Sequence, residues 1–159
     1  MGAVKNMIKG FIIAAIYVVT TIVIPILLFS WIRSMTVQGI PLDFEQEDYE
    51  RVIFWLTAFG ILISGCAFFA HSSPKQSIRR GVFALLQVLV NCLYIWSYKF
   101  SGATEVRFII ADFGYFTIDV SQMILVYMGV YFLNIVLKVY DIIDFSINRE
   151  KIREDRMKA

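Results

Sequence analysis

Histidine and cysteine are scarce in this sequence, and their scarcity excludes several kinds of chemistry. The chain has a single histidine, His71, and two cysteines, Cys66 and Cys92, which are not in a CxxC arrangement. A metal site built from several histidines is therefore excluded, and the cysteines are predicted to pack between helices rather than to form a disulfide. We predict no catalytic residue, no cofactor-binding residue and no metal site.

Charged residues are also few. Of the 159 residues 18% are charged and 58% are hydrophobic, and the mean hydropathy is +0.68. An ordinary soluble domain has about 25% charged and about 45–50% apolar residues. A soluble fold of this size could not bury so much apolar surface, and a net charge of only +2 disfavours a nucleic-acid partner. The composition predicts an integral membrane protein in contact with membrane lipids.

Four long stretches contain no Asp, Glu, Lys or Arg, and their lengths fit membrane-spanning helices. Such a helix needs about 20 apolar residues, and these stretches cover residues 10–32, 52–74, 81–98 and 120–137. They predict an all-α, four-transmembrane-helix bundle that forms one membrane domain over residues 1–159. The predicted helices are about 10–33, 50–71, 74–99 and 120–145.

The basic residues predict the orientation of the chain. Eleven of them lie in the N-terminal tail, the second connection and the C-terminal tail, whereas four lie on the opposite side. The positive-inside rule then places both termini in the cytoplasm of a multi-pass protein of the cell membrane. Tryptophans favoured at interfaces fit the same alternation, with Trp31, Trp55 and Trp96 all on the predicted outer side.

Local signals predict where the helices begin. The segment 73–76, Ser-Pro-Lys-Gln, has the pattern of a capping box, so the third helix is expected to begin near Pro74. Asp119 and Gln122 would cap the fourth helix in the same way. Pro25 is expected to kink the first helix because it removes one backbone hydrogen bond. The acidic run 43–50 suits the positive end of the second helix.

The segment 104–120 differs from the rest of the chain. It is rich in β-branched and aromatic residues on both sides of a turn at 112–114, where Gly114 can adopt a positive φ. We predict a small outer β-hairpin or sheet, to which residues 36–42 could add an edge strand. An amphipathic interfacial helix is the alternative. The charged tail 146–159 is predicted to continue the last helix into the cytoplasm.

The polar residues inside the predicted spans are uncharged. Gln87 and Asn91 lie one turn apart on the third helix, and Asn134 on the fourth helix is expected at the depth of Gln87. We predict a Gln87–Asn134 hydrogen bond that joins the two helices within an intramembrane polar cluster. The alternative is a polar path or a site for a ligand headgroup.

Two further groups of residues are singled out. Small residues on the second helix predict a face on which another helix packs closely, and this face comprises Thr57, Gly60, Ser64 and Gly65. Lys138 and Asp141 lie three residues apart at the inner end of the last helix, where Lys138 can reach the headgroups. Because the spans lack charge, an ion pump or proton-coupled transporter is not expected.

Three functions remain compatible with these features. The first is a non-catalytic accessory, assembly or scaffold subunit of a larger membrane complex, with other membrane-protein subunits as partners. The second is a homo-oligomeric channel or carrier for a small solute or ion, with other copies of the chain as partners. The third, a lipid-modifying enzyme, would depend on His71, Ser72 and Lys75 at the inner interface and is the least supported.

Overall fold

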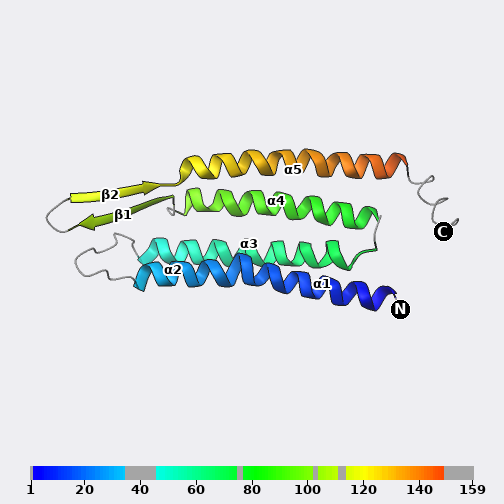
Figure 1. Cartoon of the computed structure of the whole chain (residues 1–159), viewed down its shortest axis with the longest axis horizontal. Helices are drawn as coiled ribbons and strands as arrows, with labels where there is room; N and C mark the ends of the chain where they lie inside the picture. Colours follow the sequence, from blue (N-terminus) through cyan, green and yellow to red (C-terminus); the bar gives the residue numbers. More distant parts are fainter. Residues whose placement is uncertain (1, 35–45, 75–76, 102–103, 111–113, 149–159) are drawn as a thin grey trace.

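The four apolar stretches form four long helices in the computed structural model of the chain (Figure 1). The structure describes residues 2–34, 46–74, 77–101, 104–110 and 114–148. Each helix is long and apolar enough to cross a membrane, and the candidate spans are Val4–Trp31, Tyr49–Ser72, Ile78–Phe100 and Ser121–Ile147. The elements are α1 (Gly2–Val18), η1 (Val19–Val23), α2 (Ile24–Ser34), α3 (Gln46–Ser72), α4 (Ile78–Phe100), β1 (Glu105–Ile110), β2 (Gly114–Asp119) and α5 (Ser121–Ile147).

The first helical rod is longer than predicted and contains a π-helical turn. α1 begins at Gly2 rather than near residue 10, so Lys5 and Lys9 lie within the helix. The turn η1 ends directly before Pro25, and the N–H of Ile24 donates to the carbonyl of Val19. Since Pro25 has no N–H and its ring crowds the preceding turn, the wider π-helical spacing accommodates it within a continuous rod.

The predicted start of the third span is wrong by one helical turn. α4 begins at Ile78, and Ser77 is its N-cap, with a side chain that accepts a hydrogen bond of 3.2 Å from Arg80 N–H. Ser73 is engaged elsewhere, because its hydroxyl donates to the carbonyl of Phe69 at 2.6 Å and so satisfies the end of α3. Both serines satisfy helix ends, but they belong to different helices.

Two antiparallel strands connect α4 and α5. Glu105 pairs with Asp119 at one end of the register, and Ile110 pairs with Gly114 at the other. Gly114 has a φ of +104°, a conformation that favours glycine because it has no Cβ. The proposed edge strand 36–42, the acidic residues 43–45 and the tail 149–159 lie outside the described residues.

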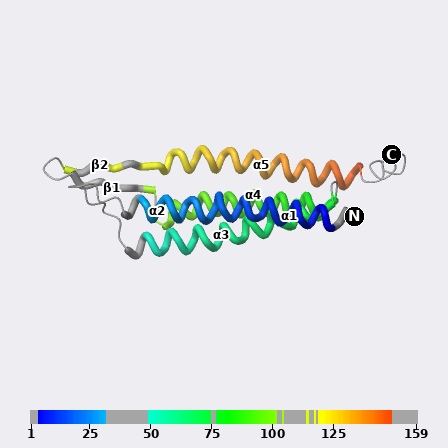
Figure 2. The backbone as a smooth tube through the Cα atoms, turned by 60° about the horizontal axis from the view of Figure 1, so that its bottom comes forward, coloured from blue at the N-terminus to red at the C-terminus, as the bar shows by residue number. Residues whose placement is uncertain are grey.

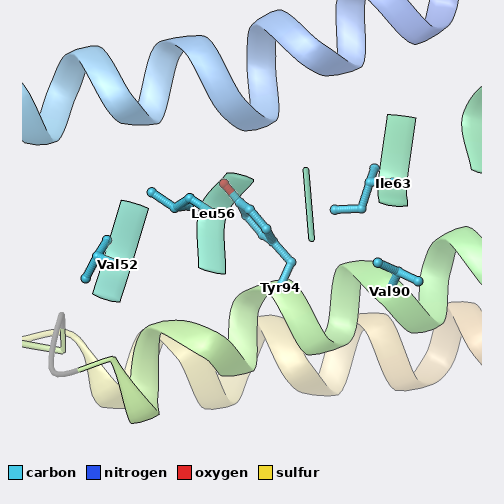
Figure 3. Close-up of a cluster of buried hydrophobic side chains, with 5 residues drawn as sticks. All are labelled: Val52, Leu56, Ile63, Val90 and Tyr94. Carbon is cyan, nitrogen blue, oxygen red and sulfur yellow. The ribbon is translucent and has the colours of Figure 1, made fainter. Parts of the chain in front are cut away.

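α3 and α4 are the two inner helices of the bundle (Figure 1). α3 packs against α1 and α4, and α4 packs against α3 and α5. The buried cluster comes from α3 and α4, and it consists of Val52, Leu56, Ile63, Val90 and Tyr94 (Figure 3). Half-buried residues of α1 and α2, among them Tyr17 and Phe29, cover this cluster, and no residue of α5 belongs to it. The molecule is therefore a three-helix core with α5 added along one side.

The first turn of α1 and the last turn of α5 lie at the same end of the helices, and the strands lie at the opposite end (Figures 1 and 2). We call these the terminal end and the strand end. Aromatic contacts fix the level of the helices near the strand end, where the rings of Trp55 and Phe100 lie 5.2 Å apart and those of Phe29 and Tyr98 lie 6.3 Å apart. Trp31 and Trp96 are exposed on α2 and α4.

Candidate functional site

The predicted small-residue face of α3 lies partly against the first helical rod. At Gly60 a Cβ would overlap Cγ1 of Ile22 in η1, so the backbones approach closely there. Ser64 is buried, and its hydroxyl donates to the carbonyl of Gly60 at 2.7 Å. Thr57 is half-buried on the same helix. Gly65 differs, because a Cβ at this position would meet no atom within 4 Å.

A second close approach, at Gly10, was not expected from the sequence. A Cβ at Gly10 would lie 2.9 Å from the Cβ of Ser72 and 3.0 Å from the carbonyl oxygen of Phe68. Gly10 is thus the place where α1 contacts the end of α3. A single glycine at the start of an apolar run carries no signal of its partner, so the sequence alone could not have identified this contact.

The most connected polar group in the core is a chain of two tyrosines, which the sequence analysis also missed. The hydroxyl of Tyr98 donates to that of Tyr94 at 3.2 Å, and the hydroxyl of Tyr94 donates to the carbonyl of Thr21 at 3.0 Å. In a regular α-helix the Thr21 carbonyl would accept from residue 25, but Pro25 has no N–H. The hydroxyl of Tyr94 points from α4 toward the first helical rod (Figure 3), where it donates to a carbonyl of the turn directly before Pro25.

The predicted hydrogen bond between Gln87 and Asn134 is wrong. The two residues lie at matching levels, because Cys92 contacts Met128 at 3.5 Å on one side of them and Gly81 faces Ile142 on the other. The Asn134 amide nevertheless donates to the carbonyl of Val130 in its own helix, at 3.1 Å. The rotation of the two helices about their axes keeps Asn134 from Gln87, so the Asn134 amide bonds within α5 instead.

The other two amides of the polar cluster stay without a hydrogen bond among the residues that the structure describes. Gln87 is buried, with 7% of its surface exposed, on the same side of α4 as Val90 and Tyr94. Asn91, one turn further along, is half-buried. Within an apolar environment an amide without a partner costs free energy. In the described part of the chain no fully buried side-chain nitrogen or oxygen lacks a hydrogen-bond partner, so the free amide atoms of Gln87 and Asn91 remain accessible to a group from another molecule.

Lys138 and Asp141 form an ion pair on α5, with 3.1 Å between Nζ and Oδ2. Both side chains are partly exposed at the terminal end, and they border an open hollow of about 260 Å³ between α4 and α5. The first turn of α4 contributes Arg80 to the same hollow. All three residues lie within the candidate spans of α4 and α5, toward the terminal end.

The remaining reactive side chains are held in structural contacts. Nδ1 of His71 lies 2.9 Å from the carbonyl of Ala67, and Cys66 and Cys92 are both free thiols. In the described part of the chain no group of three or more His, Cys, Asp or Glu residues could hold a metal ion. Outside the spans, hydrogen bonds from the hydroxyl and the backbone N–H of Ser121 lower the pKa of Asp119.

No family model, no curated protein and no solved structure matches this chain. The function is therefore inferred from the geometry of the molecule. It comprises a tightly packed three-helix core, two amides without partners on α4, and a hollow with charged residues where α4 meets α5.

Proposed function

We propose that this chain is a non-catalytic accessory subunit of a larger membrane complex, and that α4 and α5 form its docking surface. The observation that carries the proposal is the pair Gln87 and Asn91, which have no hydrogen bond within the described residues although they lie in the membrane-spanning part of α4. A neighbouring transmembrane helix with a polar side chain would satisfy both amides. Such interhelical hydrogen bonds contribute on the order of 1 kcal/mol each.

The position of α5 supports the same proposal. It contacts α4 but adds no residue to the buried cluster, and large side chains are exposed along its whole length. Exposure to lipid explains apolar residues such as Phe132 and Leu133, but a helix held on one side only also leaves room for a partner beside it. In this proposal the partner packs along α5 and reaches the amides of α4.

A homo-oligomeric channel is the second candidate, and one observation favours it. Arg80, Gln87 and Asn91 are spaced so that they lie on one side of α4, which would place polar groups at successive depths of the membrane. Copies of the chain arranged around this side would line a polar path with uncharged groups at its centre. This arrangement needs a closed ring of identical subunits, whereas the accessory role needs only one partner.

The proposed orientation places the terminal end in the cytoplasm of a cell-membrane protein and the β1–β2 strands outside. The excess of basic residues on the side of the termini supports it. Single-cysteine variants in a Cys66→Ser, Cys92→Ser background test it with a membrane-impermeant maleimide on intact cells. Thr117→Cys should be labelled, and Ala159→Cys should be labelled only after the cells are opened. The reverse pattern would refute this orientation.

The docking proposal is tested by the mass of the particle extracted from its native membrane in a lipid-preserving polymer. We expect larger, different subunits to co-purify with the wild-type chain and to be lost with Gln87→Leu, Asn91→Leu. Thr20→Val is the matched control, because the Thr20 hydroxyl already bonds to carbonyls of its own helix. A closed homo-oligomer without other subunits would contradict the accessory role. Solute flux in liposomes that is lost in the double variant would then establish the channel.

A further inference from the structure

The hollow between the first turn of α4 and the last part of α5 brings three charged residues together beside apolar side chains. It is open on one side, has a volume of about 260 Å³ and is bordered by Ser77, Arg80 and Gly81 of α4 and by Lys138, Asp141 and Phe145 of α5. The two helices come close at Gly81, where a Cβ would lie 3.0 Å from Cγ1 of Ile142. The hollow thus lies beside a fixed contact point between the helices.

The charges of the hollow favour an anion. Arg80 is half-buried, and its guanidinium has no hydrogen bond or ion pair among the residues that the structure describes. Lys138 is paired with Asp141 at 3.1 Å. The carboxylate of Asp141 therefore balances the charge of Lys138, and the positive charge of Arg80 has no counter-ion in the hollow. A guanidinium that is half withdrawn from water without an anion is unfavourable, and a phosphate is a ligand that it binds well.

The location of the hollow indicates where that phosphate comes from. The candidate span of α4 begins at Ile78 and that of α5 ends at Ile147, so the hollow lies within the terminal-end turns of both candidate spans. From there the long side chains of Arg80 and Lys138 can reach the level of the lipid headgroups. Apolar side chains, including Ile78 and Phe145, form the rest of its lining. A ligand with an anionic head and an apolar body matches both parts of this surface.

We propose that this hollow binds one anionic phospholipid, whose phosphate contacts Arg80 and Lys138 and whose acyl chains lie along α4 and α5. The side chain of Lys138 reaches the phosphate while it keeps its ion pair with Asp141, since an ammonium has three donors. Asp141 opposes the anion and limits the affinity. The site is a property of the chain alone and does not depend on the docking role.

The test is lipid binding by the full-length chain, measured by native mass spectrometry after equilibration with phosphatidylglycerol or phosphatidylcholine. We expect phosphatidylglycerol to be retained preferentially, with about a tenfold loss of affinity in Arg80→Gln and in Lys138→Gln, the size of one lost charge-assisted hydrogen bond. Asp141→Asn should strengthen binding, because it removes the opposing charge. Equal retention of the two lipids, or weaker binding in Asp141→Asn, would overturn the proposal.

Arg79→Gln is the matched control, since it removes the same charge from the same helical turn. The Arg79 guanidinium lies 5.9 Å from the ring centroids of both Phe69 and Phe83, outside the lining of this hollow. It should leave retention unchanged, and a tenfold loss there would show that only overall charge matters and would refute the site. Arg80→Lys, which keeps the charge, should retain more lipid than Arg80→Gln. Inorganic phosphate should not displace the lipid; if it does so completely, the site is one for free phosphate.

Discussion

The hydroxyl of Tyr94 in α4 donates a hydrogen bond of 3.0 Å to the backbone carbonyl of Thr21, 73 residues earlier in the chain. The bond joins the π-helical turn of the first rod to the buried cluster of α3 and α4, to which Tyr94 itself belongs. Thr21 lies in the turn directly before Pro25, which has no N–H to donate, and Tyr94 donates to the Thr21 carbonyl. The irregular turn is thus part of the packing of the core, because its Thr21 carbonyl is the acceptor for the hydroxyl of the core residue Tyr94.

Tyr94→Phe should destabilise the chain by about 1 kcal/mol, the usual net value of one such hydrogen bond. Pro25→Ala restores an N–H that can donate to the Thr21 carbonyl, so the cost of Tyr94→Phe should fall in the Pro25→Ala background. The measurement is reversible unfolding in mixed micelles for both single variants and the double variant. Tyr98→Phe is the control and should cost less, because Tyr94 keeps its bond to Thr21. Strict additivity of the two changes would contradict the link between Pro25 and Tyr94.

Gly60→Ala should destabilise the packing of α3 against η1 by about 1–3 kcal/mol, the range for overpacked core positions. The added methyl would overlap Ile22, so one of the helices must shift. Gly65→Ala on the same helix is the matched control; nothing lies within 4 Å of its Cβ position, and it should be neutral or slightly stabilising. Thermal unfolding of both variants is the measurement, and the unfolding temperature should fall in Gly60→Ala but not in Gly65→Ala. Ile22→Ala combined with Gly60→Ala should recover part of the loss.

The sequence was sufficient to predict the four spans because their length and lack of charge are local properties. It was also sufficient to identify Gly60 as a residue for close packing and to place Asn134 at the level of Gln87, since depth follows from residue counts along antiparallel helices. The rotation of each helix about its own axis could not be predicted from residue counts. It depends on which side of α4 packs against α5, and contacts such as that of Gly81 with Ile142 decide it.

The same distinction explains the errors at the helix ends. Ser73 and Ser77 both precede a helical pattern, and only the course of the backbone decides that Ser73 ends α3 while Ser77 begins α4. A kink at Pro25 was predicted, whereas the structure has a π-helical turn directly before it, and neither this turn nor its contact with Tyr94 could be predicted. Tyr94 is a distant residue, and nothing in the sequence near Pro25 points to it.

Asp119 should titrate with a pKa below the ordinary value of an aspartate, about 3.9. Its charged form accepts hydrogen bonds from the hydroxyl and the backbone N–H of Ser121, which stabilise the carboxylate at the start of α5. Because the pKa is lowered in the folded state, this contribution is present above the ordinary pKa and is lost as the pH falls through the folded value. The Ser121 amide resonance in an NMR titration should report the transition. Asp119→Asn should abolish it while keeping an acceptor, and a pKa at or above the ordinary value would contradict the assignment.

Gln87→Leu and Asn134→Leu should act independently on the stability of the isolated chain. The Asn134 amide bonds to Val130 in its own helix, and no hydrogen bond joins it to Gln87. A double-mutant cycle in mixed micelles should therefore give a coupling free energy below about 0.5 kcal/mol, the limit for residues without a shared interaction. Gln87→Leu alone should cost little or stabilise the chain, since it replaces an amide without a partner in an apolar site by a side chain of similar size. A coupling of 1 kcal/mol or more would mean that the two amides meet across α4 and α5 in the membrane. In that case Gln87 would have an internal partner and would offer nothing to a neighbouring subunit.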